Sequence, residues 1–254
     1  MSLGMTPLVF DIFQLSNLRS LHDHEEKLRD DSLKVLAADA AHSEMLFLIA
    51  NAMGILFGFS LDHKAQEDDD VTLQYFGIRL FNNAGSSIKL ALSGYTQQAL
   101  SLTRDIMEVA FLLDYFRSSP DQISVWKAAD AKARKSKFGP LQIRVALDAR
   151  DGNKERKREK AYAVLSENAS HATYGGFRLT MKNGDGQFGP FVDEPKLKAW
   201  LGELSLRLLP AAHIYGAHFL DAPTDVLRLY VAYRTQVLEW WQWNKTDEFG
   251  PEPT

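Results

Sequence analysis

An arginine and a glutamate one helical turn apart are the first residues whose types and spacing could do chemistry. Arg104 and Glu108 belong to a run, ending at Leu113, in which most other residues are apolar, as in a core helix. On a helix the two share one face, about 40° apart, with Tyr115 close to the same stripe. Leaving either buried charge unpaired would cost several kcal/mol. The pair is therefore either a salt bridge that fixes helix packing or an anion-binding or acid–base pair at the floor of a cleft, with Tyr115 as a ligand-binding candidate.

A second polar segment runs from Tyr162 to His171. On a regular helix Tyr162 and Ser166 share one face, and Glu167 and His171 share another. Because Ser166 lies about 140° around the helix from His171, the two cannot form a nucleophile and base pair. The carboxyl end of the helix favours protonated His171, which Glu167 can orient. His171 is either a satisfied histidine at a capped helix end or a general acid or base facing the arginine–glutamate pair, with Tyr162 and Ser166 as ligand-binding candidates.

These two motifs carry a resemblance to a known family. The Leu102-Thr103-Arg104-x3-Glu108 run and the later Tyr162-x3-Ser166-x4-His171 segment resemble a family of helical bacterial proteins of unknown function. In that family a Leu-x-Arg-x3-Glu helix precedes a Tyr-x3-Ser-x4-His segment. The similarity covers roughly residues 75–180. It implies an all-helical fold with these polar residues gathered in the core, and it implies no established activity.

A second resemblance rests on Arg207 and His213. Their spacing is similar to the Arg-x4–6-His motif that ribonuclease members of the HEPN superfamily carry on a helix. The segment departs from that pattern at Leu208, where a polar residue usually follows the arginine, and at Pro210, which disturbs a helix. With 7 histidines in the chain, about one match of this kind is expected by chance. This resemblance implies a metal-independent ribonuclease as the alternative function.

The stretch from Lys127 to Lys160 is strongly basic. It holds 12 Lys and Arg against 5 Asp and Glu, in a chain whose net charge is -4. Such a stretch either binds phosphates or an acidic partner, with Arg156 and Arg158 as ligand-binding candidates, or forms the solvated face of helices and a loop. Its aromatic residues are sparse, which argues against a surface for single-stranded nucleic acid.

The residue inventory excludes several classes of enzyme. The chain has no cysteine, so it has no disulfide framework, thiolate nucleophile or cysteine metal site. It lacks a His-Glu-x2-His motif, a Walker loop and a Gly-x-Gly-x2-Gly loop. The nearest approach to a di-iron motif is a single Asp39-x2-His42. We therefore expect no metal site and no cofactor.

The most apolar stretch is Met45–Leu61. Its length of about 17 residues is below the roughly 20 that cross a bilayer, so it predicts a buried helix and no membrane association. Ala50, Gly54 and Gly58 are four residues apart, which allows either a tight helix crossing or a dimer face, and we expect a homo-oligomer. The amino terminus has no basic segment of a secretory signal, which favours a cytoplasmic location.

Apolar spacing and breaker residues predict one all-α domain. We expect a helical bundle of about six to eight helices over residues 1–245, one small β-hairpin near 177–192, and a flexible tail at 246–254. Thr6 and Pro7 open the first helix, residues 121–137 form one helix, and residues 154–174 form another that ends at Gly175-Gly176. Asp193 and Pro223 open the last two helices.

Two functions of different classes follow from these observations. The first is a soluble, noncatalytic helical protein that self-associates and binds a protein partner or a small anionic ligand through its polar core cluster. The alternative is a HEPN-like ribonuclease or toxin-like enzyme that uses His171, or Arg207 with His213, and places the basic segment on RNA phosphates. We prefer the first, and the sequence leaves open whether the protein is an enzyme.

Overall fold

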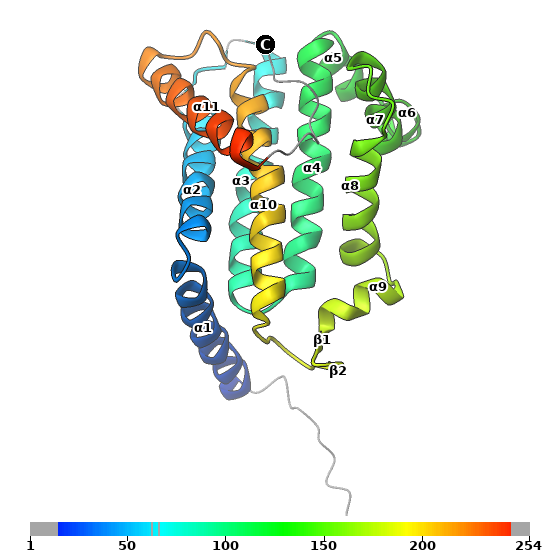
Figure 1. The fold of residues 1–254 in the computed structure, drawn as a ribbon. Helices are drawn as coiled ribbons and strands as arrows, with labels where there is room; N and C mark the ends of the chain where they lie inside the picture. Colours follow the sequence, from blue (N-terminus) through cyan, green and yellow to red (C-terminus); the bar gives the residue numbers. More distant parts are fainter. Residues whose placement is uncertain (1–14, 62, 66, 245–254) are drawn as a thin grey trace, which may run out of the picture.

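The computed structural model describes residues 15–61, 63–65 and 67–244, and most of them are helical (Figure 1). The long helices are α1 (Leu15–Ala37), α2 (Ala40–Leu61), α3 (Asp68–Leu92), α4 (Thr96–Ser118), α10 (Glu194–Gly216) and α11 (Thr224–Asn244). The short helices are α5 (Gln122–Ala128), α6 (Ala131–Phe138), α7 (Pro140–Arg150), α8 (Lys157–Leu165) and α9 (Tyr174–Phe177). A π-helical turn, η1 (Ser166–Ser170), follows α8, and a 3-10 turn, η2 (Arg178–Thr180), precedes the antiparallel hairpin of β1 (Met181–Lys182) and β2 (Asp185–Gly186).

The predicted all-α bundle with a small hairpin is confirmed. The described residues form eleven α-helices rather than about six to eight, because residues 122–177 are divided into five short ones. The predicted helix start at Thr6 and Pro7 and the predicted tail at 246–254 lie outside the described residues.

Four long helices enclose the core. Helix α10 packs against α2, α3 and α4, and α3 also packs against α2 and α4 (Figure 1). Trp200 of α10 is fully buried, and its indole Nε1 donates to Ser87 Oγ of α3 at 3.0 Å. The Ser87 hydroxyl in turn donates to the Ala99 carbonyl of α4 at 2.9 Å. Buried polar groups need partners, so this chain of hydrogen bonds fixes the relative positions of the three helices.

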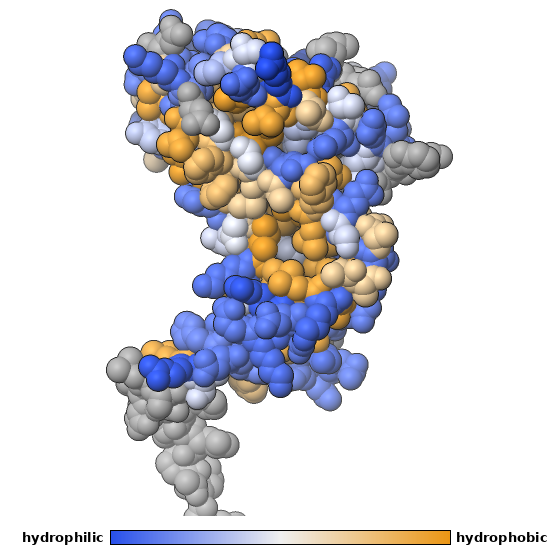
Figure 2. Space-filling model, turned by 90° about the vertical axis from the view of Figure 1, so that its left-hand side faces the viewer, coloured by the Kyte–Doolittle hydropathy of each residue, from blue (hydrophilic) through white to orange (hydrophobic). Residues whose placement is uncertain are grey.

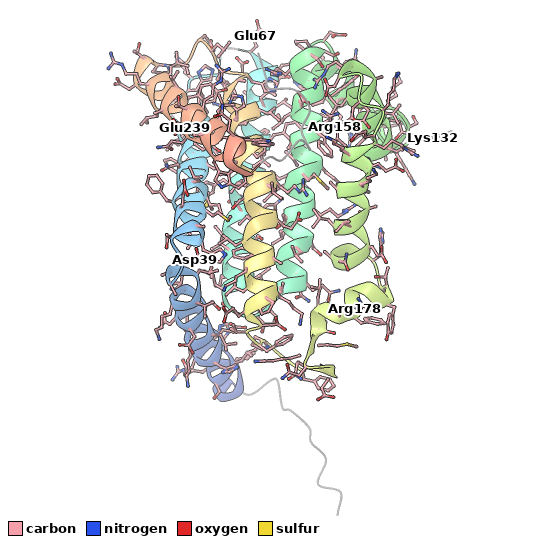
Figure 3. All side chains as sticks on the ribbon, in the orientation of Figure 1. Asp39, Glu67, Lys132, Arg158, Arg178 and Glu239 are labelled. Carbon is pink, nitrogen blue, oxygen red and sulfur yellow. The ribbon has the colours of Figure 1, made fainter. Side chains whose placement is uncertain are left out.

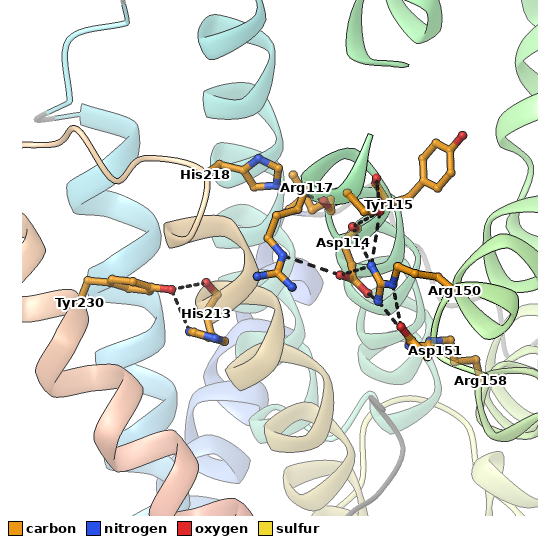
Figure 4. Close-up of polar contacts among 11 residues, drawn as sticks. Asp114, Tyr115, Arg117, Arg150, Asp151, Arg158, His213, His218 and Tyr230 are labelled. Atoms are coloured by element: carbon orange, nitrogen blue, oxygen red, sulfur yellow. Dashed lines mark hydrogen bonds and ion pairs between the residues drawn. The ribbon is translucent and has the colours of Figure 1, made fainter. Parts of the chain in front are cut away.

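The short helices form a second layer along α4. Helices α7 and α8 and the turn η1 all pack against α4, on the side away from α2 (Figure 1). The layer is joined to α4 by charges: Arg150 of α7 donates to both carboxylate oxygens of Asp114 on α4, at 2.9 and 2.8 Å. The same guanidinium reaches Asp151 at 2.6 Å (Figure 4). This network holds α7 against α4, and the candidate site lies in the same interface.

Two predicted helices are wrong in their extent. Residues 121–137 are divided after α5, because Ala129 is extended and the Asp130 side chain caps α6 by accepting from Ala133 N at 2.7 Å. The helix predicted over residues 154–174 ends at Leu165, directly before the turn η1. Gly175-Gly176 therefore do not terminate it. Gly176 instead lies inside α9, where a Cβ would be only 3.0 Å from the Asn168 carbonyl oxygen.

Helix α2 is more exposed than predicted. It spans 22 residues, and of the described residues only this helix is long and apolar enough to cross a membrane by length and composition, with 33% of its most apolar window buried. The prediction of a buried helix is right for the face that carries Leu48 and Phe59 and wrong for the outer face, where Phe47 and Phe57 are exposed. Figure 2 shows hydrophobic side chains gathered on this side of the molecule.

Candidate functional site

Arg104 lies at the centre of a polar cluster between α4, α8 and η1. Its Nη2 lies 2.8 Å from Glu108 Oε1, and its Nε donates to Ser166 Oγ at 2.8 Å. Nη2 also donates to the Tyr162 hydroxyl, and the guanidinium carbon lies 4.6 Å from the centre of the Tyr162 ring. The predicted contact between the Arg104 helix and the Tyr162 segment is therefore present, and the arginine has a carboxylate, two hydroxyls and an aromatic ring around it.

Arg144 of α7 lies on the same tyrosine and was not predicted. Its guanidinium carbon is 3.9 Å from the centre of the Tyr162 ring, and only 7% of the residue is exposed. Its Nε and Nη1 are buried without a hydrogen-bond partner, and no described carboxylate forms an ion pair with it. The sequence holds one signal for the burial of Arg144: Ile143 and Leu147 are four residues apart, so on a helix they mark a buried face next to it. Because no helix is predicted over residues 140–150, this spacing alone does not indicate burial.

The cluster therefore holds one positive charge in excess. Glu108 neutralises Arg104. Asp148, one turn after Arg144, pairs instead with Arg158 at 2.7 Å. The Ser166 hydroxyl accepts from Arg104 and keeps its own proton to donate, and no described group accepts that proton. Arg104 is 18% and Glu108 25% exposed in their side chains, so solvent reaches one side of the cluster. Two guanidinium groups and a hydroxyl donor in a partly closed interface are the chemistry of an anion site.

His171 does not join the cluster, contrary to the prediction. The π-helical turn η1 places its backbone N–H on the Ser166 carbonyl at 3.2 Å, in the extended residue that ends the turn. Its side chain is exposed, and it makes no hydrogen bond or ion pair with the part of the chain that the structure describes. The predicted orientation by Glu167 is absent for the same reason. Among the described residues no contact therefore joins His171 to Arg104, through which it would act there as a general acid or base.

Three predicted ligand-binding residues lie elsewhere. Tyr115 makes no hydrogen bond or ring contact with the described residues of the cluster and packs against Phe138 of α6, with ring centres 6.3 Å apart. Arg156 is exposed, directly precedes α8, and pairs with Glu159 in the first turn of that helix. Arg158 is 1% exposed, and its guanidinium is shared between Asp148 and Asp151. Arg158 therefore holds α7 to α8 and is not available to a ligand.

Arg207 and His213 do not form a common site. Both are buried in α10, where Arg207 pairs with Glu203 at 3.0 Å and His213 Nδ1 lies 2.9 Å from the Tyr230 hydroxyl of α11. Burial, together with the charges of Arg234 and Arg117, lowers the pKa of His213 to about 4. An uncharged histidine that bonds to a neighbouring helix is a packing residue. Each side chain has a partner of its own, Glu203 for Arg207 and Tyr230 for His213, so the two are not arranged to act together on a phosphodiester.

The basic stretch is paired only in part with acidic groups of the described residues. Lys127 pairs with Asp68 and Asp69 at the start of α3, and Arg134 donates to the Ala129 carbonyl at 2.7 Å. Lys132 projects outward from α6 (Figure 3). Among the residues that the structure describes, no group of three or more His, Asp or Glu could hold a metal ion.

Comparison with family models, with curated proteins and with solved structures finds no match to this chain. The assignment of the site therefore depends on its own geometry.

Proposed function

We propose that this protein binds a small anionic ligand, without catalysing its conversion, at the cluster of Arg104, Arg144, Tyr162 and Ser166. The observation that carries the proposal is the buried guanidinium of Arg144, which has no carboxylate partner among the described residues. The Tyr162 ring contributes on the order of 2 kcal/mol to such a desolvated cation. Removing a charged group from water costs several kcal/mol, so the ring does not offset the cost. An anion held by Arg144 and by the free proton of Ser166 supplies the missing partner.

We propose binding without catalysis because of the residues that surround the anion. The cluster contains no group poised as a general base beside a nucleophile, because Glu108 is paired with Arg104 and His171 lies in solvent. The ribonuclease alternative has no supporting contact, since Arg207 and His213 have separate partners.

Calorimetric titration with inorganic phosphate and with acetate, at constant ionic strength, tests the proposal. We expect saturable binding at one site per chain, and at least a tenfold loss of affinity in Arg144→Met. The matched control is Arg228→Met, which removes an exposed arginine of α11 that pairs with Asp225 at 3.6 Å, and it should leave the affinity unchanged. Absence of saturable binding of either anion at millimolar concentration would contradict the proposal.

The same variant gives a second, independent readout. In buffer without a binding anion, Arg144→Met should raise the free energy of unfolding by about 1 kcal/mol, because it removes a buried charge that lacks a partner. Urea denaturation measures the change. A loss of stability would assign Arg144 a structural role on Tyr162 instead.

A further inference from the structure

A pocket of about 240 Å³ lies beside the arginine cluster, among α3, α4, α5, α6 and α7. Its walls are mainly apolar. The aromatic part is made by Phe76, Phe111, Trp126 and Phe138. The Phe76 and Trp126 rings lie 5.1 Å apart and are inclined at 50°. Inclined rings at this spacing present both edges and faces to the space between them, which favours an aromatic guest over a saturated one by about 0.5–1.5 kcal/mol.

The pocket and the cluster share their boundary. Glu108 lines the pocket and also pairs with Arg104. Ile143 forms a wall of the pocket, and the next residue on α7 is Arg144. Both Ile143 and Arg144 are buried, so the chain passes from the apolar wall to the unpaired guanidinium within one residue. The pocket therefore adjoins the cluster through Glu108 and through the helix α7 that carries both Ile143 and Arg144, while Arg144 itself does not line it.

The acidic groups that line the pocket are already paired, which disfavours an amine as the ligand. Arg79 binds Asp105 through two bonds, Nε to Oδ2 at 2.8 Å and Nη2 to Oδ1 at 2.6 Å. Asn83 donates to the same carboxylate. Glu108, the other acidic group of the pocket, is neutralised by Arg104. Neither carboxylate is left for an ammonium group, whereas Arg144 still lacks a counter-charge.

We propose that the ligand is an organic anion in which an acidic group is joined by a short spacer to a single aromatic ring. The acidic group binds Arg144 and Ser166, and the ring occupies the pocket between Phe76, Trp126 and Phe138. The volume is below the range of about 300–1,000 Å³ that holds drug-sized molecules, so the body is compact. This inference rests on the proposed anion site and adds the class of molecule that the site selects.

Titration with four probes tests this inference on the full chain. The probes are 3-phenylpropanoate, acetate, 3-phenylpropylamine and inorganic phosphate. We expect 3-phenylpropanoate to bind at least tenfold more tightly than acetate, and the amine not to bind. If acetate and phosphate bind while 3-phenylpropanoate gains nothing over acetate, the pocket inference is wrong and the anion site stands. If no anion binds, the proposed function itself fails.

Two substitutions separate the parts of the site. Leu112 of α4 lines the pocket, so the larger side chain of Leu112→Phe fills part of it. This variant should lose most of the advantage of 3-phenylpropanoate over acetate, while its affinity for acetate stays unchanged. Leu141→Phe adds the same volume at an exposed position of α7 and serves as its control. Arg144→Met should weaken both carboxylates by similar factors. Undiminished binding of 3-phenylpropanoate to Arg144→Met, or to a folded Leu112→Phe protein, would overturn the proposal.

Discussion

Arg104 and Arg144 contact the same tyrosine but differ in what else surrounds them. Arg104 has a carboxylate 2.8 Å away and two hydroxyl partners, which is the usual arrangement for a partly buried guanidinium. Arg144 is more deeply buried and has the ring alone among the described groups. The contrast is informative because both sit in one interface. Residue type alone does not distinguish them, and the difference in partners identifies which of the two is available to a ligand.

The buried His213 and the half-buried His218 predict how stability depends on pH. Burial lowers the pKa of His213 and of His218 to about 4; Arg234 and Arg117 add to the effect at His213. Around His218 the Leu113 carbonyl and Asp114 act in the opposite direction, and Arg117 lowers the pKa further. The folded pKa lies below the unfolded value of about 6.5, so the unfolded chain binds more protons between these values. Their contribution to stability is complete above pH 6.5 and is lost as the pH falls towards 4.

Urea denaturation at pH 8 and pH 5 measures this loss. Each histidine should account for about 2 kcal/mol of the decrease in the free energy of unfolding, because one pKa unit corresponds to about 1.4 kcal/mol. His213→Gln should therefore reduce the decrease by about half, whatever its effect at pH 8. Substitution of the exposed His171 by Gln is the matched control and should leave the decrease intact. Equal decreases in wild type and His213→Gln would contradict the assignment.

At the scale of elements, a shared buried charge network joins α7 and α8. Arg158 binds Asp148 at 2.7 Å and also contacts Asp151, which Arg150 binds at 2.6 Å (Figure 4). Burial by itself raises the pKa of Asp151, but the two arginines outweigh it and the net pKa lies below its usual value. The network therefore stays charged at neutral pH and sets the position of α7, and with it the position of Arg144.

Removing the central arginine should separate these elements. Arg158→Met leaves Asp148 buried without its partner, so we expect the free energy of unfolding to fall by about 3 kcal/mol. Arg156→Met removes an exposed arginine two positions earlier on the chain and should change stability by less than about 0.5 kcal/mol. Chemical denaturation of both variants checks the difference. Comparable effects of the two substitutions would show that the network contributes nothing beyond surface charge.

How far the sequence predicts the site depends on which helical geometry applies. Arg104 and Glu108 are on a regular helix, so their shared face follows from a period of 3.6 residues. Tyr162 and Ser166 also share a face as predicted, because α8 is regular up to Leu165. The position predicted for His171 differs from the observed one because the backbone widens into the π turn η1. The spacing of apolar residues does not reveal such a turn. Asp130 can be recognised as the N-cap of a second helix only when Ala129 before it is known to be extended.

At the scale of the whole molecule, one face is apolar and is not covered by any described residue. Along α2 the exposed residues Phe47, Ala50, Gly54, Phe57 and Leu61 are three or four apart and form one stripe. A Cβ built on Gly54 would meet no atom within 4 Å, so the predicted tight crossing is not made there by any described helix. The Phe57 ring lies 6.1 Å from the ring of Phe81 on α3, so the apolar surface continues from α2 to α3. Exposed apolar patches of this kind mark interaction surfaces in soluble proteins.

We expect this face to pair with the same face of a second copy, because small residues at its centre let two identical helices approach closely about a two-fold axis. Light scattering after size-exclusion chromatography should give the mass of a dimer for the wild type and of a monomer for Phe47→Glu/Phe57→Glu. Val164→Glu places the same charge at an exposed apolar position of α8, in the layer on the other side of α4, and should stay dimeric. A wild-type chain that remains monomeric at high concentration would refute self-association, and its capture by phospholipid vesicles would assign the stripe to a lipid surface instead.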